Sequence, residues 1–228
     1  MTEGTAIHWF RQDLRIKDNP SLESASKYKS FIPIYILDDE NAKEFAMGSA
    51  SRWWLHHSLQ ALNKSLGGNL LFFKGNPEEI FKQLLENQDI SYISWNRCYE
   101  PWRMDRDKKI KKDLEERNVQ IESFCGSLLW EPWTISKDDG TPYRVFTPFY
   151  KKGCLNSIEP RLPNDFASLK NINTHKVKSS SLDSLDLLPK IEWYKGFENE
   201  WSPGEDGADK SLDEFLDSGL INYKEGRN

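Results

Sequence analysis

The segment Ile7-His8-Trp9-Phe10-Arg11-Gln12-Asp13-Leu14-Arg15, followed by Asp18-Asn19-Pro20, is the most informative part of this sequence. Its apolar first half has the length of a buried strand and ends in a cluster of charged residues. In an open α/β sheet, ligands bind at the edge formed by the carboxyl ends of the strands. The segment therefore predicts a first strand that delivers charged side chains to a ligand-binding edge. The alternative is that Asp13 simply neutralises Arg11 and Arg15 at a strand-to-helix turn.

Further apolar runs of strand length follow along the chain, and patterns typical of helices separate them. The runs predicted as buried parallel strands are residues 6–10, 31–37, 69–74, 92–96 and 119–124. Short turns between alternating strands and helices require right-handed crossovers. Residues 5–125 are therefore expected to form a Rossmann-like, doubly wound, five-stranded parallel sheet flanked by helices, which is an α/β fold.

Helical patterns are clearest in three places. Residues 49–66 place leucines on one face before Gly67-Gly68 ends the helix. Asn76 is expected to cap the next helix, with Pro77 at its first position. Residues 101–118 are mostly charged, which predicts a solvent-exposed helix rather than a DNA-binding patch. Its expected ion pairs, at four-residue spacing, are Asp105 with Lys109, Asp107 with Lys111, and Asp113 with Arg117.

The rest of the sequence has a different character. Residues 126–155 are rich in aromatic residues, proline and glycine, and residues 156–202 lack a lasting periodicity. A long connector over the surface of the sheet domain is expected here. Residues 209–223 then regain a helical pattern with no evident packing partner. The predicted organisation is an α/β domain in residues 1–130, a connector in residues 131–205 that packs on this domain and a short terminal helical part in residues 206–228.

Composition restricts the functional classes. The chain has a formal net charge of -5, whereas a protein that grips the DNA backbone is expected to be basic. Either DNA is not bound or the DNA-binding face lies elsewhere. Cys98, Cys125 and Cys154 form no CxxC pair, so neither a disulfide framework nor a metal site is expected. No signal-peptide pattern and no apolar run of the ~20 residues of a membrane span occur, so a cytoplasmic location is expected.

Familiar enzyme motifs are absent from the sequence. No GxGxxG follows the first strand and no GxxxxGK[ST] occurs. The side chains of residues 10–13 would obstruct a pyrophosphate at the helix end, which disfavours a dinucleotide-dependent dehydrogenase. His56 and His57 lie in a helical pattern without an assignable nucleophile, and His8 is expected to be a buried core histidine. No hydrolytic site is therefore predicted.

The fourth strand leads into Trp95-Asn96-Arg97-Cys98-Tyr99-Glu100-Pro101-Trp102-Arg103. This segment gathers aromatic rings, a carboxylate and guanidinium groups at the carboxyl edge of the sheet. Stacking rings with a few oriented polar groups suit a planar heteroaromatic ligand. On spacing alone, a proline-initiated helix with Glu100 near its positive end explains the segment equally well.

Residues 7–20 and 95–107 resemble the opening segment and the antenna-site segment of the DNA photolyase and cryptochrome family. Further segments resemble the same family in the same order, and the last two are similar to its transition into a helical flavin domain. These segments are residues 129–133 with 140–149, residues 201–205 and residues 223–228. Ordered matches that cover nearly the whole chain make chance agreement improbable.

The resemblance implies a flavoprotein lyase that repairs ultraviolet pyrimidine dimers by passing an electron from photoexcited reduced FAD to a flipped-out lesion. In the family, a helical domain holds FAD and damaged DNA, and residues 206–228 would be only its start. Tyr223 matches a tyrosine that touches FAD. The chain would then be the light-harvesting α/β half, with the helical FAD domain as its partner, damaged DNA bound through that domain, and no membrane or metal. Repair by this chain alone is not expected.

The resemblance also implies an antenna chromophore at the carboxyl edge of the sheet. By position, its pocket would use Leu37, Asp38, Met47, Arg52, Cys98 and Glu100. Arg103 stands where folate-type antennas rely on an acid, and Cys98 replaces an acidic position of some deazaflavin binders. A deazaflavin is therefore expected over methenyltetrahydrofolate, and an empty pocket is the third possibility.

Two other functions are compatible with the sequence. One is an autonomous nucleotide- or flavin-binding module that works with a separate helical subunit. The other is a cryptochrome-like blue-light sensor without repair activity, because in this family substrate choice and signalling are settled beyond the region that corresponds to this chain.

Overall fold

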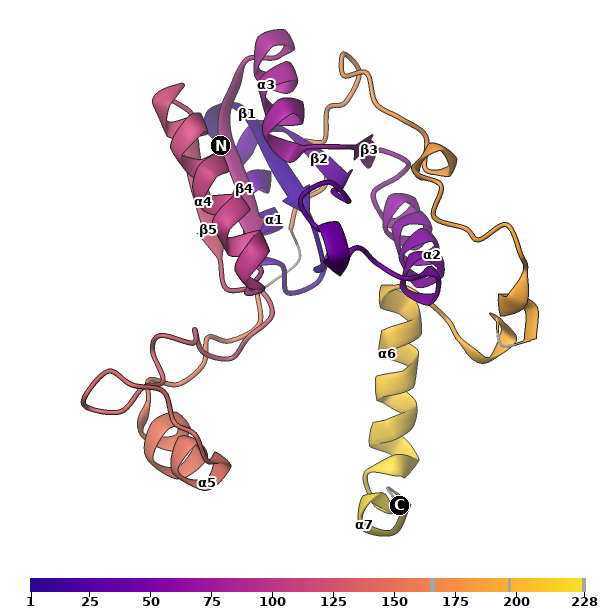
Figure 1. The fold of residues 1–228 in the computed structure, drawn as a ribbon. Helices are drawn as coiled ribbons and strands as arrows, with labels where there is room; N and C mark the ends of the chain where they lie inside the picture. Colours follow the sequence, from indigo (N-terminus) through magenta and orange to yellow (C-terminus); the bar gives the residue numbers. More distant parts are fainter. Residues whose placement is uncertain (165–166, 197, 227–228) are drawn as a thin grey trace.

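A parallel sheet of five strands forms the centre of the protein (Figure 1). The structure is a computed structural model that describes residues 1–164, 167–196 and 198–226. Its strands are β1 Thr2–Phe10, β2 Tyr28–Leu37, β3 Leu71–Lys74, β4 Ile90–Asn96 and β5 Gln120–Phe124. They are ordered β3-β2-β1-β4-β5, so the chain winds outward in both directions from the central β1. The predicted fold class is confirmed.

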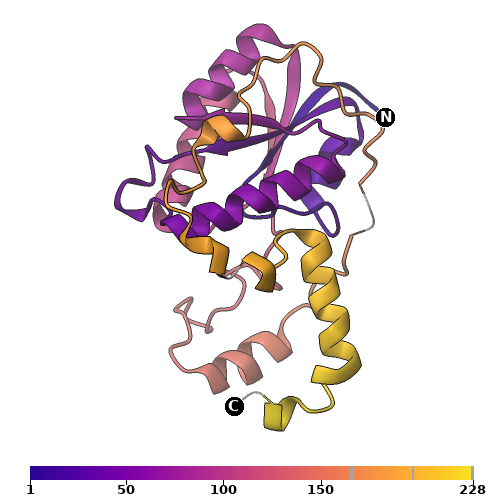
Figure 2. The ribbon, with the colours of Figure 1, turned by 90° about the vertical axis from the view of Figure 1, so that its right-hand side faces the viewer.

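Helices connect consecutive strands and cover both faces of the sheet (Figures 1 and 2). They are α1 Pro20–Ser26, α2 Ser49–Ser65, α3 Pro77–Asn87 and α4 Pro101–Glu116. Asn76 caps α3 as predicted, because its side chain accepts the Glu78 N–H at 3.0 Å. The periodicity does not predict the short α1, although Asn19 caps it in the same way by accepting the Leu22 N–H at 3.1 Å.

The ion pairs along α4 differ in part from the prediction. Asp113 and Arg117 pair at 3.0 Å, as predicted. Asp105 pairs with Lys108 at 3.6 Å instead of with Lys109, which shows that three-residue spacing competes with four-residue spacing on an exposed helix. The third carboxylate of this helix, Asp107, points into the protein and belongs to the site described below.

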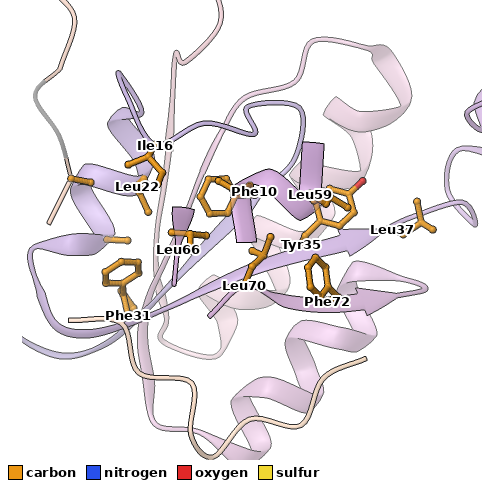
Figure 3. Close-up of a cluster of buried hydrophobic side chains, with 14 of the residues drawn as sticks. Phe10, Ile16, Leu22, Phe31, Tyr35, Leu37, Leu59, Leu66, Leu70 and Phe72 are labelled. Atoms are coloured by element: carbon orange, nitrogen blue, oxygen red, sulfur yellow. The ribbon is translucent and has the colours of Figure 1, made fainter. Parts of the chain in front are cut away.

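Two apolar layers, one on each face of the sheet, form the core. Side chains alternate along β1, so Ala6 and Phe10 pack toward α1 and α2, whereas Ile7 and Trp9 pack toward α3 and α4. The first layer is shown in Figure 3. In the second layer, the fully buried indole of Trp9 meets the indole of Trp95 edge-on, with ring centroids 5.6 Å apart. Large rings therefore supply much of the apolar burial.

Part of the long connector completes the first apolar layer. The Phe31 N–H donates to the Asn171 carbonyl at 2.9 Å, and the Ser180 N–H donates to the Phe72 carbonyl at 2.8 Å. The side chain of Leu185 is fully buried in this layer. Residues 167–187 are thus structurally integral to the α/β unit, on the side of β2 and β3. The domain limits at residues 130 and 205 stay predictions.

Two helical segments extend away from the sheet (Figures 1 and 2). One consists of α5 Phe146–Pro148, a π-helical turn Phe149–Gly153 and a 3-10 turn Cys154–Asn156. The other consists of α6 Glu205–Glu214, a π-helical turn Phe215–Gly219 and α7 Tyr223–Gly226. The terminal helix therefore begins four residues before the predicted Asp209. Arg227 and Asn228, the end of the predicted helical part, lie outside the described residues.

Exposed apolar side chains mark both of these segments. Phe146 is 73% exposed and Ile221 is 82% exposed, whereas an isolated soluble domain rarely gathers such side chains on projecting helices. Across the described ranges, no helix is both long enough and apolar enough to cross a membrane.

His8 makes the stability of the fold depend on pH. The ring is buried, its Nδ1 lies 3.0 Å from the Ser21 hydroxyl, and burial lowers its pKa from 6.5 to about 4. Between these pKa values the unfolded chain binds a proton that the folded chain does not, so stability should fall by up to about 3 kcal/mol as the pH drops from 6.5 to 4. Denaturant titrations at pH 7 and pH 4.5 should show a smaller loss for His8→Gln than for the parent. Equal losses would contradict this assignment.

The contribution of the connector can be tested with a matched pair of leucines. Leu185→Ala removes a fully buried side chain and should lower the free energy of unfolding by about 2–5 kcal/mol. Leu162→Ala removes a connector side chain that is 84% exposed and should change stability by less than about 0.5 kcal/mol. Urea denaturation measures both variants. If Leu185→Ala is as mild as its control, the connector is not part of the core.

Candidate ligand-binding site

A buried carboxylate, Asp107, joins the end of β1 to helix α4. The Arg11 guanidinium follows directly after β1 and donates to Asp107 Oδ2 and to the backbone carbonyl of Asn96. Asp107 is only 7% exposed, so the predicted surface pair with Lys111 is wrong. A buried carboxylate requires close, charged hydrogen-bond donors, which the guanidinium supplies. Lys111 donates instead to the Ser123 hydroxyl at 2.7 Å.

Arg106 extends this contact to the end of β2. Its Nη2 donates to Asp107 Oδ1 and its Nη1 donates to Asp38 Oδ2, both at 2.9 Å. The guanidinium carbon also lies 4.9 Å from the ring centre of Trp9 and 5.3 Å from that of Trp102. Guanidinium groups and carboxylates therefore alternate across the carboxyl edge of the sheet, so that the buried charges compensate one another.

Asp13 organises the turn after β1 and forms no ion pair with Arg11 or Arg15 in the described structure. Its carboxylate accepts the backbone N–H of Arg11 at 3.1 Å and the side-chain amides of Asn19 at 3.2 Å and Asn96 at 2.6 Å. The alternative that this aspartate only neutralises the neighbouring arginines is therefore wrong. Its role is to hold the start of α1 against the end of β4.

Gly126 allows the chain after β5 to approach the same turn. Arg15 donates to the Gly126 carbonyl at 2.6 Å and to the Asp18 carbonyl at 2.8 Å. A Cβ atom at position 126 would lie 2.4 Å from Cγ of Asn96, which is closer than side chains tolerate. The turn after β1, the end of β4 and the segment after β5 are thus fixed as one unit.

A cleft of about 970 Å³ opens above these groups. The ends of β1 and β2 form its floor, and residues of α2, α4 and α6 form its walls. It lies where ligands bind in open α/β sheets. Its lining includes four aromatic side chains and four guanidinium groups, which belong to Trp9, Tyr35, Trp54, Trp102, Arg11, Arg15, Arg103 and Arg106.

The first turns of α6 close one side of the cleft. The Glu205 carboxylate accepts the backbone N–H groups of Ile16 at 2.9 Å and Lys17 at 2.8 Å. Lys17 also forms an ion pair with Asp209. Gly204 has a φ of 107°, which allows the chain to turn abruptly into this helix. These contacts explain why the helix begins earlier than its apolar periodicity predicts.

The residues predicted to hold a chromophore fall into separate groups. Leu37, Asp38 and Met47 line the cleft together. Arg52 lies behind this wall, where it donates to the Met47 carbonyl at 2.9 Å and to Asp39 at 2.8 Å. Its visible role is to hold the loop that carries Met47.

Cys98, Glu100 and Tyr223 are not among the residues that line the cleft. Arg103 lies between the first two, with Nη1 3.5 Å from Cys98 Sγ and Nε 3.7 Å from a Glu100 carboxylate oxygen. Burial raises the pKa of the Cys98 thiol, and Glu100 accepts the Gln12 side-chain amide at 2.9 Å. Tyr223 is 52% exposed on α7, at the far end of the segment that starts with α6 (Figure 1).

Several lining residues were not selected from the sequence. Arg106 lies in the segment that resembles the family's antenna site, four residues after Trp102, whose ring the sequence did place at this edge. Tyr35 lies in the predicted second strand, and burial raises the pKa of its hydroxyl group. Trp54 sits in the helical pattern of α2, where no sequence signal separates it from its neighbour Trp53.

The remaining chemical candidates do not form a reactive cluster. His56 is buried on α2, and burial together with the adjacent His57 lowers its pKa. Within the described part of the chain, no group of three or more His, Cys, Asp or Glu residues is placed to hold a metal ion. The arrangement therefore fits a binding site for a planar, negatively charged or polarisable ligand.

Asp107 should be indispensable for the stability of the edge. Asp107→Asn leaves the guanidinium groups of Arg11 and Arg106 buried without their shared anion, which should cost about 3–5 kcal/mol. Asp113→Asn on the same helix breaks only the exposed pair with Arg117 and should cost about 0.2–1 kcal/mol. Chemical denaturation of both variants tests the difference. Similar losses would show that the buried pair is not what holds this edge.

Comparison with known proteins shows which family this chain resembles. The family model described as DNA photolyase matches residues 6–165. A deoxyribodipyrimidine photo-lyase of Agrobacterium fabrum is 41% identical over 228 residues, which covers 97% of this chain and 46% of that protein. Cryptochrome-2 of Arabidopsis thaliana is 35% identical over 226 residues, which covers 95% of this chain and 37% of that protein.

A solved structure shares the fold over the whole extent of this chain. The crystal structure of a bacterial class III photolyase from Agrobacterium tumefaciens superposes with a TM-score of 0.89 at 38% identity. The alignment covers 100% of this chain and 47% of that one, so the chain spans less than half the length of the curated relatives named above. The matches confirm the resemblance read from the sequence, and the chain belongs to the DNA photolyase family, as a counterpart of its N-terminal α/β part.

Proposed function

We propose that this chain binds an antenna chromophore in the cleft and passes its excitation energy to FAD during the light-dependent repair of pyrimidine dimers. The observation that carries the proposal is the cleft itself, which has the volume of a cofactor site and lies at the carboxyl edge of the sheet. The Trp54 and Trp102 rings in its walls provide flat surfaces for a heteroaromatic ring system.

Charge in the cleft favours a chromophore with acidic or electron-rich groups. The carboxylates that line it are already engaged: Asp18 by Arg161, Asp38 by Arg106, Asp209 by Lys17, and Glu205 by backbone N–H groups. Among the cationic groups, Arg15 and Arg103 have only longer contacts with their acidic partners, at 3.8 Å with Asp18 and at 3.7 Å with Glu100. An acidic group on the ligand would complete this arrangement.

The same residues support one chromophore over the other. Methenyltetrahydrofolate carries a cationic amidinium, for which the cleft offers no uncommitted carboxylate among its described lining residues. A deazaflavin carries no such charge. The arginine at position 103 therefore supports a deazaflavin as the first expectation, with methenyltetrahydrofolate as the direct competitor.

Repair of DNA would require a helical FAD domain in addition to this chain. Support comes from the relatives, of which the chain spans less than half, and from the net charge of -5, which does not suit a DNA-binding face. The projecting segments of α5 and α6 expose apolar side chains where such a domain would pack. Tyr223 on α7 is the residue proposed to reach FAD.

A cryptochrome-like light sensor is the second candidate function. The match to Cryptochrome-2 of Arabidopsis thaliana favours it. An antenna-binding α/β part would serve either function, so the cleft does not discriminate between them.

The proposal predicts a specific effect of Trp102 on chromophore affinity. Trp102→Ala removes one ring of the cleft wall and should weaken binding about tenfold, which corresponds to about 1.4 kcal/mol of stacking. Trp133→Ala removes an exposed ring outside the cleft and should leave the affinity unchanged. Parallel fluorescence titrations with an 8-hydroxy-5-deazaflavin and with methenyltetrahydrofolate measure both the affinity and the preference. Absence of binding for both compounds, or equal effects of the two variants, would refute the proposed site.

A further inference from the structure

Helix α4 turns one stripe of side chains toward a second, smaller cavity. The stripe recurs at spacings of three and four residues, which places its members on one face of the helix. It comprises Met104, Asp107, Lys108 and Lys111. Together with residues from the ends of β4 and β5 and from the following loop, chiefly Trp95, Tyr99, Ser123 and Trp133, it lines a cavity of about 120 Å³.

This cavity is separate from the large cleft. In the described ranges, no residue lines both spaces. Asp107 lies between the two spaces, and its carboxylate borders the small cavity. Both carboxylate oxygens accept hydrogen bonds from arginines that line the cleft, one from Arg11 and one from Arg106. That carboxylate is therefore already compensated and is a poor partner for a further cation.

Lys111 brings to the small cavity a positive charge that the nearby carboxylates of Asp107 and Glu115 only partly offset. Its ammonium group donates to the Ser123 hydroxyl at 2.7 Å and lies 5.7 Å from the ring centre of Trp95. It has no ion-pair partner within 4 Å in the described part of the chain, unlike the neighbouring Lys108. Burial lowers the pKa of Lys111, and the nearby guanidinium of Arg97 lowers it further. An anion bound beside this ammonium would offset both effects.

The other walls of the cavity are largely apolar and flat. The rings of Tyr99 and Trp133 lie 6.3 Å apart, the indole of Trp95 is fully buried at the base, and Met104 adds an adaptable thioether. A closed apolar cavity of ~150 Å³ holds benzene in a protein core. A partly open cavity of about 120 Å³ is therefore the right size for one six-membered ring whose charged group reaches the rim.

We propose that this cavity is a second binding site, specific for a small aromatic carboxylate. The ring would lie between Trp95, Met104 and Trp133, and the carboxylate would accept a hydrogen bond from Lys111. Ring binding alone would give weak affinity, and the ammonium supplies the preference for an anion. The site does not depend on the antenna function, because it shares no lining residue with the cleft.

Calorimetric titration of the purified chain with benzoate at pH 7 tests this proposal. Benzoate should bind at least tenfold more tightly than benzamide, which has the same shape and no charge, and more tightly than inorganic phosphate, which has charge and no ring. In a ¹H–¹⁵N spectrum, the indole signals of Trp95 and Trp133 should shift upon addition of benzoate, whereas that of Trp54 in the cleft should not. Equal binding of benzoate and benzamide, stronger binding of phosphate, or no binding would overturn the proposal.

Two lysines on α4 provide a matched pair of variants that tests whether the charge of Lys111 holds the carboxylate of the ligand. Lys111→Met should lower the affinity for benzoate at least tenfold, whereas Lys112→Met, at an exposed position outside the cavity, should change it less than twofold. If Lys111→Met does not fold, the comparison of benzoate with benzamide on the parent chain still decides the result. If the parent chain binds the chromophore but not benzoate, the small-cavity proposal is refuted and the antenna site is not. If it binds benzoate but not the chromophore, the antenna site is refuted and the small-cavity proposal is supported.

Discussion

The Asp107 carboxylate, held between the guanidinium groups of Arg11 and Arg106, is the interaction on which the ligand-binding edge depends. An arginine at the end of a strand would normally extend its side chain into water. Here Arg11 is buried under α4, which is tolerable only because an anion meets it there. Arg106 in turn donates to the carboxylate of Asp38, the residue directly after the neighbouring strand β2. The network thereby sets the distance between α4 and the ends of β1 and β2, and so the floor of the cleft.

Much of the fold could be predicted because local signals agreed with the packing. Apolar runs predicted the strands, and the Asn76-Pro77 pair predicted the start of α3. The same type of cap at Asn19 was overlooked because α1 is only 7 residues long and shows little periodicity. The connector was expected to run over the domain and pack on it, but Leu185 could not be picked out as a core residue, since an irregular segment has no periodicity that indicates which side chain will be buried.

The site was less predictable than the fold for a physical reason. Charge spacing on α4 indicates which residues share a face, but it does not indicate which face turns inward. Burial of Asp107 depends on Arg11, which is 96 positions away in the sequence. The resemblance to the family pointed to the carboxyl edge, where Leu37, Asp38 and Met47 line the cleft together. It did not anticipate that Glu205 would bring α6 to the cleft, since that contact joins two parts of the chain with no common pattern.

We expect a planar chromophore to bind in the cleft above this network. A crystal structure of the chain grown with the tighter-binding of the two chromophores would show whether it does. Electron density for the ring system should lie in the cleft, against Trp102 and within reach of the Arg103 guanidinium. Density for the chromophore elsewhere, or an empty cleft at saturating chromophore, would contradict this expectation.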